Sequence, residues 1–151
     1  MSDLPCGCPG SNLRTIDRPE TEQPETGVLQ SELRQWPTQL TLVPPTAPWL
    51  QDADLLVAAD CVPFAYADFH REFIKGRVLV NACPKLDDCG PYIEKLTAMF
   101  QQNNIRSVTV PIMEVPCCRG LAAVVQQAIS ASGKDVPLEV VIVGVDGELR
   151  N

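Results

Sequence analysis

The sequence predicts an α/β fold in which a mostly parallel sheet of about five strands lies between layers of helices. Two observations carry this prediction. Short apolar segments alternate along the chain with longer segments whose apolar residues recur at helical spacing, and the connections between them are short. The run at residues 55–59 is apolar without interruption, which is typical of a strand buried on both faces of its sheet.

The first half of the predicted domain contains three strands and one helix. Residues 39–43 (Gln-Leu-Thr-Leu-Val) predict a first strand, which the two following prolines end. A short helical turn is expected at 48–52, ahead of the strand at 55–59. Residues 64–75 carry apolar side chains at helical spacing and are followed by glycine, so we expect a helix there. The apolar residues of 77–82 predict the next strand.

The second half continues the alternation. Asp87 or Asp88 can cap a helix that runs to about residue 103 with one apolar stripe. Residues 107–113 are rich in β-branched side chains and predict a strand. A helix is expected at 117–132, then a last strand at 140–145 and an Asp-Gly turn. With right-handed crossovers, this order gives a Rossmann-like or flavodoxin-like three-layer sandwich, and it leaves the order of the strands in the sheet open.

Two regions differ in composition. Residues 1–35 contain little apolar material, and the stretch at 18–27 is acidic and interrupted by prolines, so we expect a flexible segment that carries a Cys-Gly-Cys turn. Residues 36–151 have the texture of a packed α/β domain, and at 151 residues the whole chain can bury a single core.

Charge and hydropathy exclude several classes of function. The formal charge of −7 argues against a surface for nucleic acid or for anionic membranes, since neither polyanion attracts an acidic protein. The apolar runs are too short to span a bilayer, and the N-terminus has no pattern of a secretory signal. We therefore expect a cytoplasmic protein.

The seven cysteines are the most informative residues, and four of them follow predicted strands. Cys61 follows the strand at 55–59, Cys83 follows the next strand, and Cys117 and Cys118 lie between the strand at 107–113 and its helix. Because ligands of open parallel sheets bind outside the carboxyl ends of the strands, these thiols are expected to meet at one edge. Unrelated buried cysteines are the competing interpretation.

The surroundings of these cysteines suit thiolates. Cys117 and Cys118 open a helix, where the positive dipole end and free N–H groups stabilise a thiolate or donate to cluster sulfides. A vicinal disulfide, or one ligand beside a bystander, is the alternative for this pair. Asp60 and Glu114 stand beside ligand positions and can accept outer hydrogen bonds, and Lys85 can offset thiolate charge; all three also fit ordinary loop residues.

Three other cysteines and the single histidine are assigned no role at the site. Cys89 lies near a helix start and could reach the same edge, but a thiol on the face of the helix is the favoured interpretation, and His70 is expected on the surface. The pair Cys6 and Cys8 has no partner pair in the sequence, so it can complete a site between two chains, hold a second site or do neither. No G-x-G-x-x-G or P-loop sequence supports nucleotide binding.

Four cysteines without histidine suit either tetrahedral zinc or an iron–sulfur cluster. Structural zinc usually takes paired cysteines from one small unit, whereas these are single cysteines spread over a sheet that has a core of its own. We therefore favour an iron–sulfur cluster and keep zinc as the alternative.

Five segments also resemble a known family. Residues 7–11, 33–37, 58–65, 83–88 and 113–121 resemble the C-terminal region of ferredoxin-like 4Fe–4S proteins of anaerobic bacteria, in which a dicluster ferredoxin module precedes this domain. The resemblance implies an electron-transfer setting with Cys61, Cys83, Cys117 and Cys118 as the recurring cysteines. This chain departs from the family because it lacks the C-x₂-C-x₂-C-x₃-C modules.

Three functions are therefore weighed. The first is a cluster carrier or electron-transfer module that works with a redox partner protein or a ferredoxin-type module and is not an enzyme by itself. The second is a redox enzyme that uses the cluster or a reactive thiol on a small substrate. The third is a zinc-binding or metal-free interaction domain. A homodimer whose chains share one site is a further option.

Overall fold

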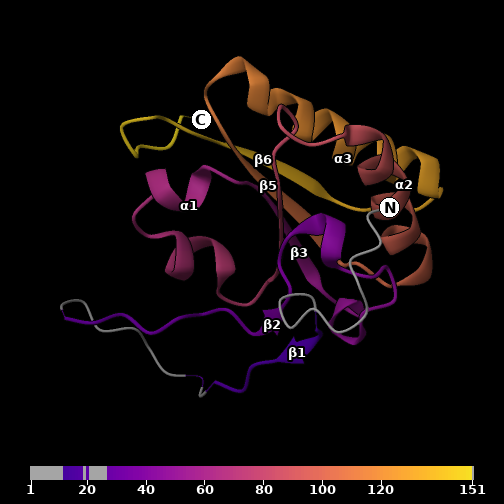
Figure 1. Ribbon diagram of the computed structural model, residues 1–151, viewed down its shortest axis with the longest axis horizontal. Helices are drawn as coiled ribbons and strands as arrows, with labels where there is room; N and C mark the ends of the chain where they lie inside the picture. Colours follow the sequence, from indigo (N-terminus) through magenta and orange to yellow (C-terminus); the bar gives the residue numbers. More distant parts are fainter. Residues whose placement is uncertain (1–11, 19, 21–26, 151) are drawn as a thin grey trace.

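The computed structural model describes residues 12–18, 20 and 27–150, and its centre is a four-stranded parallel sheet (Figure 1). The strands are β3 (Asp54–Ala59), β4 (Val78–Ala82), β5 (Ser107–Met113) and β6 (Leu138–Val143), in the order β4-β3-β5-β6. A separate antiparallel pair joins β1 (Arg14–Thr15) to β2 (Gln35–Trp36). The parallel α/β architecture is as predicted from the sequence.

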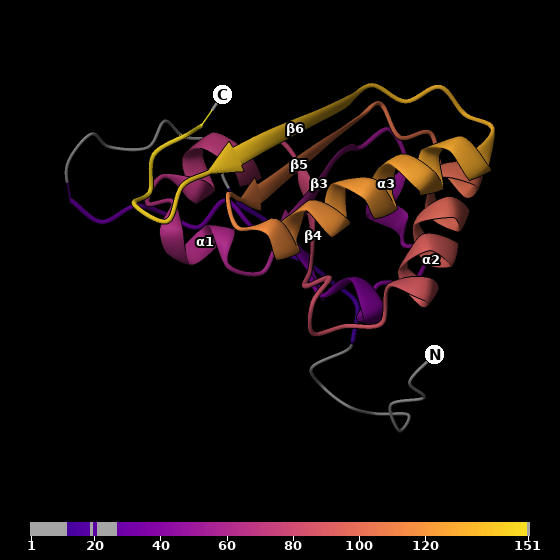
Figure 2. The same cartoon turned by 90° about the horizontal axis from the view of Figure 1, so that it is seen from above.

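Helices lie on both faces of the sheet, which makes three layers (Figures 1 and 2). The long helices α2 (Cys89–Gln102) and α3 (Arg119–Ser132) pack against each other on one face. The short helix α1 (Val62–Ala65) and the π-helical turn η4 (His70–Ile74) lie on the other. The chain moves from β3 to β4 in one direction and from β5 to β6 in the other, so right-handed crossovers place their helices on opposite faces.

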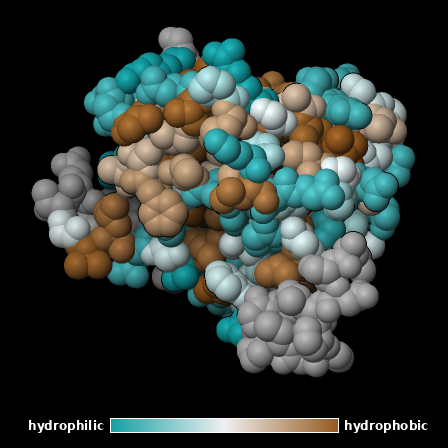
Figure 3. Space-filling view, turned by 45° about the horizontal axis from the view of Figure 1, so that its top comes forward, coloured by the Kyte–Doolittle hydropathy of each residue, from teal (hydrophilic) through white to brown (hydrophobic). Residues whose placement is uncertain are grey.

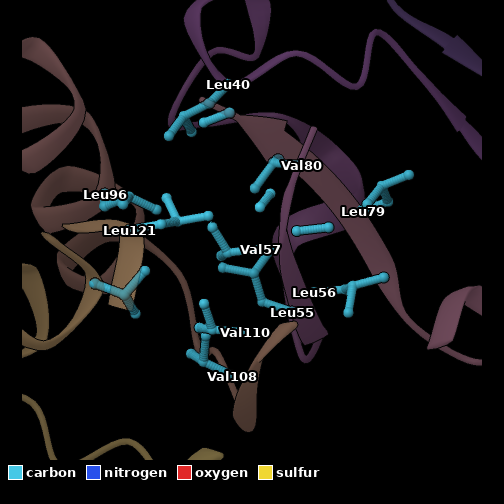
Figure 4. Close-up of a cluster of buried hydrophobic side chains, with 14 of the residues drawn as sticks. Leu40, Leu55, Leu56, Val57, Leu79, Val80, Leu96, Val108, Val110 and Leu121 are labelled. Atoms are coloured by element: carbon cyan, nitrogen blue, oxygen red, sulfur yellow. The ribbon is translucent and has the colours of Figure 1, made fainter. Parts of the chain in front are cut away.

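The core lies on both sides of this sheet, as the unbroken apolar strand predicts (Figure 4). Leu55 and Val57 of β3 point toward Leu96 of α2 and Leu121 of α3, and all four side chains are fully buried. Leu56, next in the chain, points to the opposite face.

The expected strand at 39–43 is wrong. Leu40–Leu42 form a 3₁₀ turn (η2), capped by the side chain of Gln39, which accepts a hydrogen bond from the N–H of Thr41 at 2.6 Å. Leu40 and Val43 are both fully buried, and residues three apart share one side of a 3₁₀ turn. Gln39 alone makes an isolated bridge to Asn81, so this segment adds no fifth strand.

The expected continuous helix at 64–75 is also wrong, because two short turns replace it. Tyr66 has an extended backbone after α1, and η4 begins four residues later. The aromatic residues explain the break, since Tyr66 folds back to pack edge-on against Phe73 with ring centroids 5.3 Å apart. Phe73 and Phe69 are buried, so the apolar spacing reflects burial rather than one long helix.

The remaining elements follow the prediction with shifted ends. Asp88 caps α2 by accepting a hydrogen bond from the N–H of Gly90, and β5 has the predicted bounds. A 3₁₀ turn, η5 (Pro116–Cys118), precedes α3, and another, η3 (Pro48–Leu50), occupies the predicted short turn. The last strand begins two residues earlier than expected. Among the described residues, no helix has the length and apolar character needed to cross a bilayer.

Replacement of Gly133 with alanine should destabilise the protein by about 1 kcal/mol. Gly133 ends α3 in the left-handed conformation (φ 73°), and a Cβ there would meet no atom within 4 Å, so the cost comes from the backbone alone. Urea unfolding would measure this loss of stability. Gly90→Ala is the matched control, because Gly90 lies inside α2 with ordinary helical geometry; an equal loss in both variants would contradict this explanation.

Candidate functional site

The carboxyl ends of the central strands bring the cysteine-bearing segments to one edge of the sheet. β3 and β4 pair in parallel up to Ala59 and Ala82, and the N–H of Asp60 continues the ladder by donating to the carbonyl of Ala82 at 3.1 Å. Cys61 and Cys83, the next residues along these two strands, therefore leave the sheet side by side. In Figure 2, β5 and β6 point toward the same side of the molecule, where α3 begins.

The cysteine-bearing segment after β5 lies directly on the segment after β4. A Cβ placed on Gly120, in the first turn of α3, would be 3.4 Å from the Cβ of Pro84. The start of α3 thus rests on the residue that follows Cys83, and Cys117 and Cys118 immediately precede this helix. Three segments that are distant in sequence meet at this edge.

Among the described cysteines, Cys118 is the one most enclosed by protein, with 7% of its surface exposed, and it occupies the N-cap position of the 14-residue helix α3. Burial is the main cause that raises the pKa of Cys118; a backbone hydrogen bond at Met113 lowers this pKa, and the charges of Cys117 and Cys61 raise it further. Cys61 and Cys117 are therefore near enough to Cys118 for their charges to act on its pKa.

Cys83 lies in a tightly closed loop. Its N–H donates to Oδ2 of Asp87 at 3.0 Å, and the N–H of Asp87 donates back to the carbonyl of Cys83 at 2.9 Å. Cys89, the first residue of α2, donates its thiol hydrogen to the carbonyl of Pro84 at 3.5 Å. Burial, followed by the charges of Asp88, Asp87 and Cys83, raises the pKa of Cys89. Cys89 is therefore close to Cys83 but has a backbone partner of its own.

The five described cysteines are all free thiols, and their sulfur atoms have the chemistry of zinc or iron–sulfur ligands. Within the described part of the chain, no three His, Cys, Asp or Glu side chains are arranged to hold a metal ion. Cys61 and Cys117 are exposed. Rotation of exposed side chains displaces no packed atoms, so these two thiols are free to turn toward a shared ligand. Cys6 and Cys8 lie outside the described residues.

The charged residues expected near the thiols have other partners. Asp60 accepts a hydrogen bond from Nδ2 of Asn81 at 2.8 Å. Oε2 of Glu114 accepts from the N–H of Val145 at 2.6 Å and lies 3.9 Å from Arg150. Asp60 thus joins the end of β3 to β4, and Glu114 joins the loop after β5 to the turn after β6. Lys85 is exposed beside Pro84.

A polar network that sequence reasoning missed anchors the Cys83 loop. The hydroxyl of Tyr92 in α2 donates to Asp87, the same carboxylate that receives the N–H of Cys83. Nε2 of Gln39 donates to Tyr92 at 2.9 Å. Burial, and then the hydrogen bond to Asp87, raise the pKa of Tyr92 to about 12. No spacing rule links positions 39, 87 and 92, so only the fold reveals the network.

Replacement of Tyr92 with phenylalanine should cost about 1–3 kcal/mol, because the half-buried carboxylate of Asp87 loses one of its hydrogen-bond donors. The folded-state pKa of about 12 lies above the ordinary value of 10.0, so the contribution of Tyr92 is complete below pH 10 and is lost as the pH rises toward 12. Unfolding measured from pH 7 to 11 would test this. A difference between wild type and variant that grows with pH would contradict it.

His70 lies apart from the thiols, as the sequence suggested. Its Nδ1 accepts a hydrogen bond from the N–H of Glu32 at 3.1 Å, and the side chain is exposed. It borders a shallow cavity of about 220 Å³ between residues 29–31 and η4. No cysteine is among the described residues that line this cavity.

Comparisons with known proteins agree with this architecture. A family model described as a Rossmann-like domain matches residues 47–151. The chain belongs to this family. It is also 34% identical over 119 residues to an uncharacterised protein of Archaeoglobus fulgidus, a match that covers 79% of this chain and 84% of the relative. No solved structure matches significantly.

The position of the cysteines in this Rossmann-like domain is distinctive. The order β4-β3-β5-β6 corresponds to the flavodoxin-like order 2-1-3-4, in which ligands bind where the chain leaves two adjacent strands toward opposite faces. Here those strands are β3 and β5. Cys61 follows β3, and Cys117 and Cys118 follow β5. Neither connection contains a glycine-rich phosphate loop.

Proposed function

We propose that this Rossmann-like domain binds an iron–sulfur cluster, of the 4Fe–4S type, and works as an electron-transfer or cluster-carrier module. The ligands in this proposal are Cys61, Cys83, Cys117 and Cys118. The observation that carries it is the meeting of three cysteine-bearing segments at the switch point of the sheet. A fold that needed cysteine only for packing would have no reason to gather thiols there.

The surroundings support thiolate ligands. The positive end of α3 lies at Cys117 and Cys118, where the helix dipole favours thiolates, although the N–H groups of Cys118 and Arg119 already donate to the carbonyls of Val115 and Pro116. Asp60, Lys85 and Glu114 form the outer polar shell in this proposal. A bound cation would favour the thiolate forms that the neighbouring sulfurs otherwise oppose.

Two further considerations agree with a cluster. The resemblance of five segments to ferredoxin-like 4Fe–4S proteins includes the cysteines at the edge. All described cysteines are free, as expected in the reducing cytoplasm where we place the protein. A redox partner protein, or a ferredoxin-type module on another chain, would then supply or receive the electrons.

Anaerobic reconstitution with iron and sulfide tests the proposal. The expected product is a brown protein with absorbance near roughly 400 nm, equal amounts of iron and acid-labile sulfide, and an electron paramagnetic resonance signal after reduction. Colourless protein free of iron would refute the proposal. Equimolar zinc in protein isolated without oxygen would instead select a zinc-binding interaction domain.

A further inference from the structure

The loops around the cysteine edge carry an unusual share of exposed apolar side chains. Phe64 is 92% exposed three residues after Cys61, Leu86 is 83% exposed three residues after Cys83, and Val145 is 67% exposed after β6. Val115 and Leu149 are exposed in the loops beside them. Among the described residues, these are five of the ten large apolar side chains on the surface, and single exposed apolar residues elsewhere need no explanation.

Phe64, Val115, Val145 and Leu149 belong to segments that touch one another. Leu86 lies in the loop after β4, whose Pro84 rests on Gly120 at the start of α3. A Cβ on Gly147 would lie 2.8 Å from the carbonyl oxygen of Ala65, so the turn after β6 rests on α1 next to Phe64. The hydrogen bond from Val145 to Glu114 joins the same turn to the loop that holds Val115. In Figure 3, apolar colours gather at the left, on the side where α1 and the C-terminal turn lie in Figure 1. We name these five residues the apolar edge.

Acidic charge surrounds the apolar edge. The four loops after β3, β4, β5 and β6 contain six carboxylates (Asp60, Asp87, Asp88, Glu114, Asp146 and Glu148) and two basic residues (Lys85 and Arg150), and Arg119 begins α3 beside them. Arg150 is already paired with Asp146 at 2.7 Å. A four-thiolate cluster would add negative charge, since the thiolates outweigh the positive core. A complementary partner must therefore be basic.

We propose that the apolar edge docks a redox protein whose contact surface is an apolar patch ringed by lysine and arginine. This inference rests on the proposed function, because docking there brings the partner beside the cluster. A second copy of this chain is the less suitable occupant, since two acidic edges would repel each other. Specific, transient protein–protein interfaces usually have an apolar centre and a charged rim.

Electron transfer to cytochrome c, a basic haem protein, tests the inference. Cluster-loaded protein is reduced, freed of reductant and mixed anaerobically with ferric cytochrome c; one electron leaves the cluster and reduces the haem iron. Phe64→Ser and Leu86→Ser should each lower the second-order rate by about three- to tenfold. Val28→Ser, which alters an 83% exposed valine outside these loops, should react like wild type. The wild-type rate should fall as ionic strength rises.

Cluster absorbance, measured first in every variant, separates the two proposals. If wild-type protein takes up no cluster, the proposed function and this inference both fail. If the clusters are intact but Phe64→Ser and Leu86→Ser react as fast as Val28→Ser, or the rate does not depend on salt, the docking inference alone is wrong. A wild-type dimer that Phe64→Ser converts to a monomer in sedimentation would also overturn it.

Discussion

Protein with Cys118→Ser is expected to retain less than roughly a tenth of the iron bound by wild type after reconstitution, because loss of a ligand costs more than the loss of an outer partner. Cys118 is the buried thiol at the start of α3, and it interacts with Cys61 and Cys117. Serine keeps nearly the same shape, so the fold should persist. Iron analysis and the cluster absorbance are the measurements.

Cys89→Ser is the matched control for this variant. Cys89 also lies at the start of a 14-residue helix and near the same edge, but its thiol donates to the carbonyl of Pro84. Its removal should leave the iron content unchanged. Equal iron in Cys118→Ser and wild type, or equal losses in both variants, would contradict the ligand assignment.

Leu121→Ala is expected to destabilise the fold by about 3 kcal/mol or more, within the range found for buried leucines. Leu121 is fully buried between α3 and the sheet, close to Leu96 of α2 and facing Val57 (Figure 4). Alanine would leave a cavity that the crossing of α2 and α3 cannot close. Urea unfolding would measure the loss.

Gln126→Ala on the same helix is the control, since Gln126 is exposed and its replacement should change stability by less than about 0.5 kcal/mol. Because α3 also carries Cys118, we expect Leu121→Ala to weaken cluster retention as well. A loss below about 1 kcal/mol would show that the helix interface is not packed as described.

Much of the fold follows from local sequence signals. The continuous apolar run of β3 and the β-branched run of β5 predict strands because a sheet covered on both faces needs apolar residues at every position. Asp88 marks the start of α2 because its side chain caps the helix. Gly133 marks the end of α3 because glycine readily adopts the left-handed backbone conformation. These signals act over a few residues, so the sequence alone reveals them.

The errors arise where distant contacts decide the conformation. Tyr66 leaves the helical path to pack on Phe73, and Gln39 caps a 3₁₀ turn while it also reaches Tyr92 of α2. For the site, the rule that ligands of parallel sheets bind at the carboxyl ends of the strands predicts the cysteines at one edge. It does not reveal that Asp87 and Tyr92 hold the Cys83 loop.

A crystal structure of anaerobically reconstituted protein, with anomalous scattering recorded at the iron edge, tests the central claim most directly. The account predicts one iron–sulfur density between the ends of β3, β4 and β5, bonded to the sulfur atoms of Cys61, Cys83, Cys117 and Cys118. An iron site bound elsewhere, or an edge that stays empty in protein loaded with iron and sulfide, would contradict it.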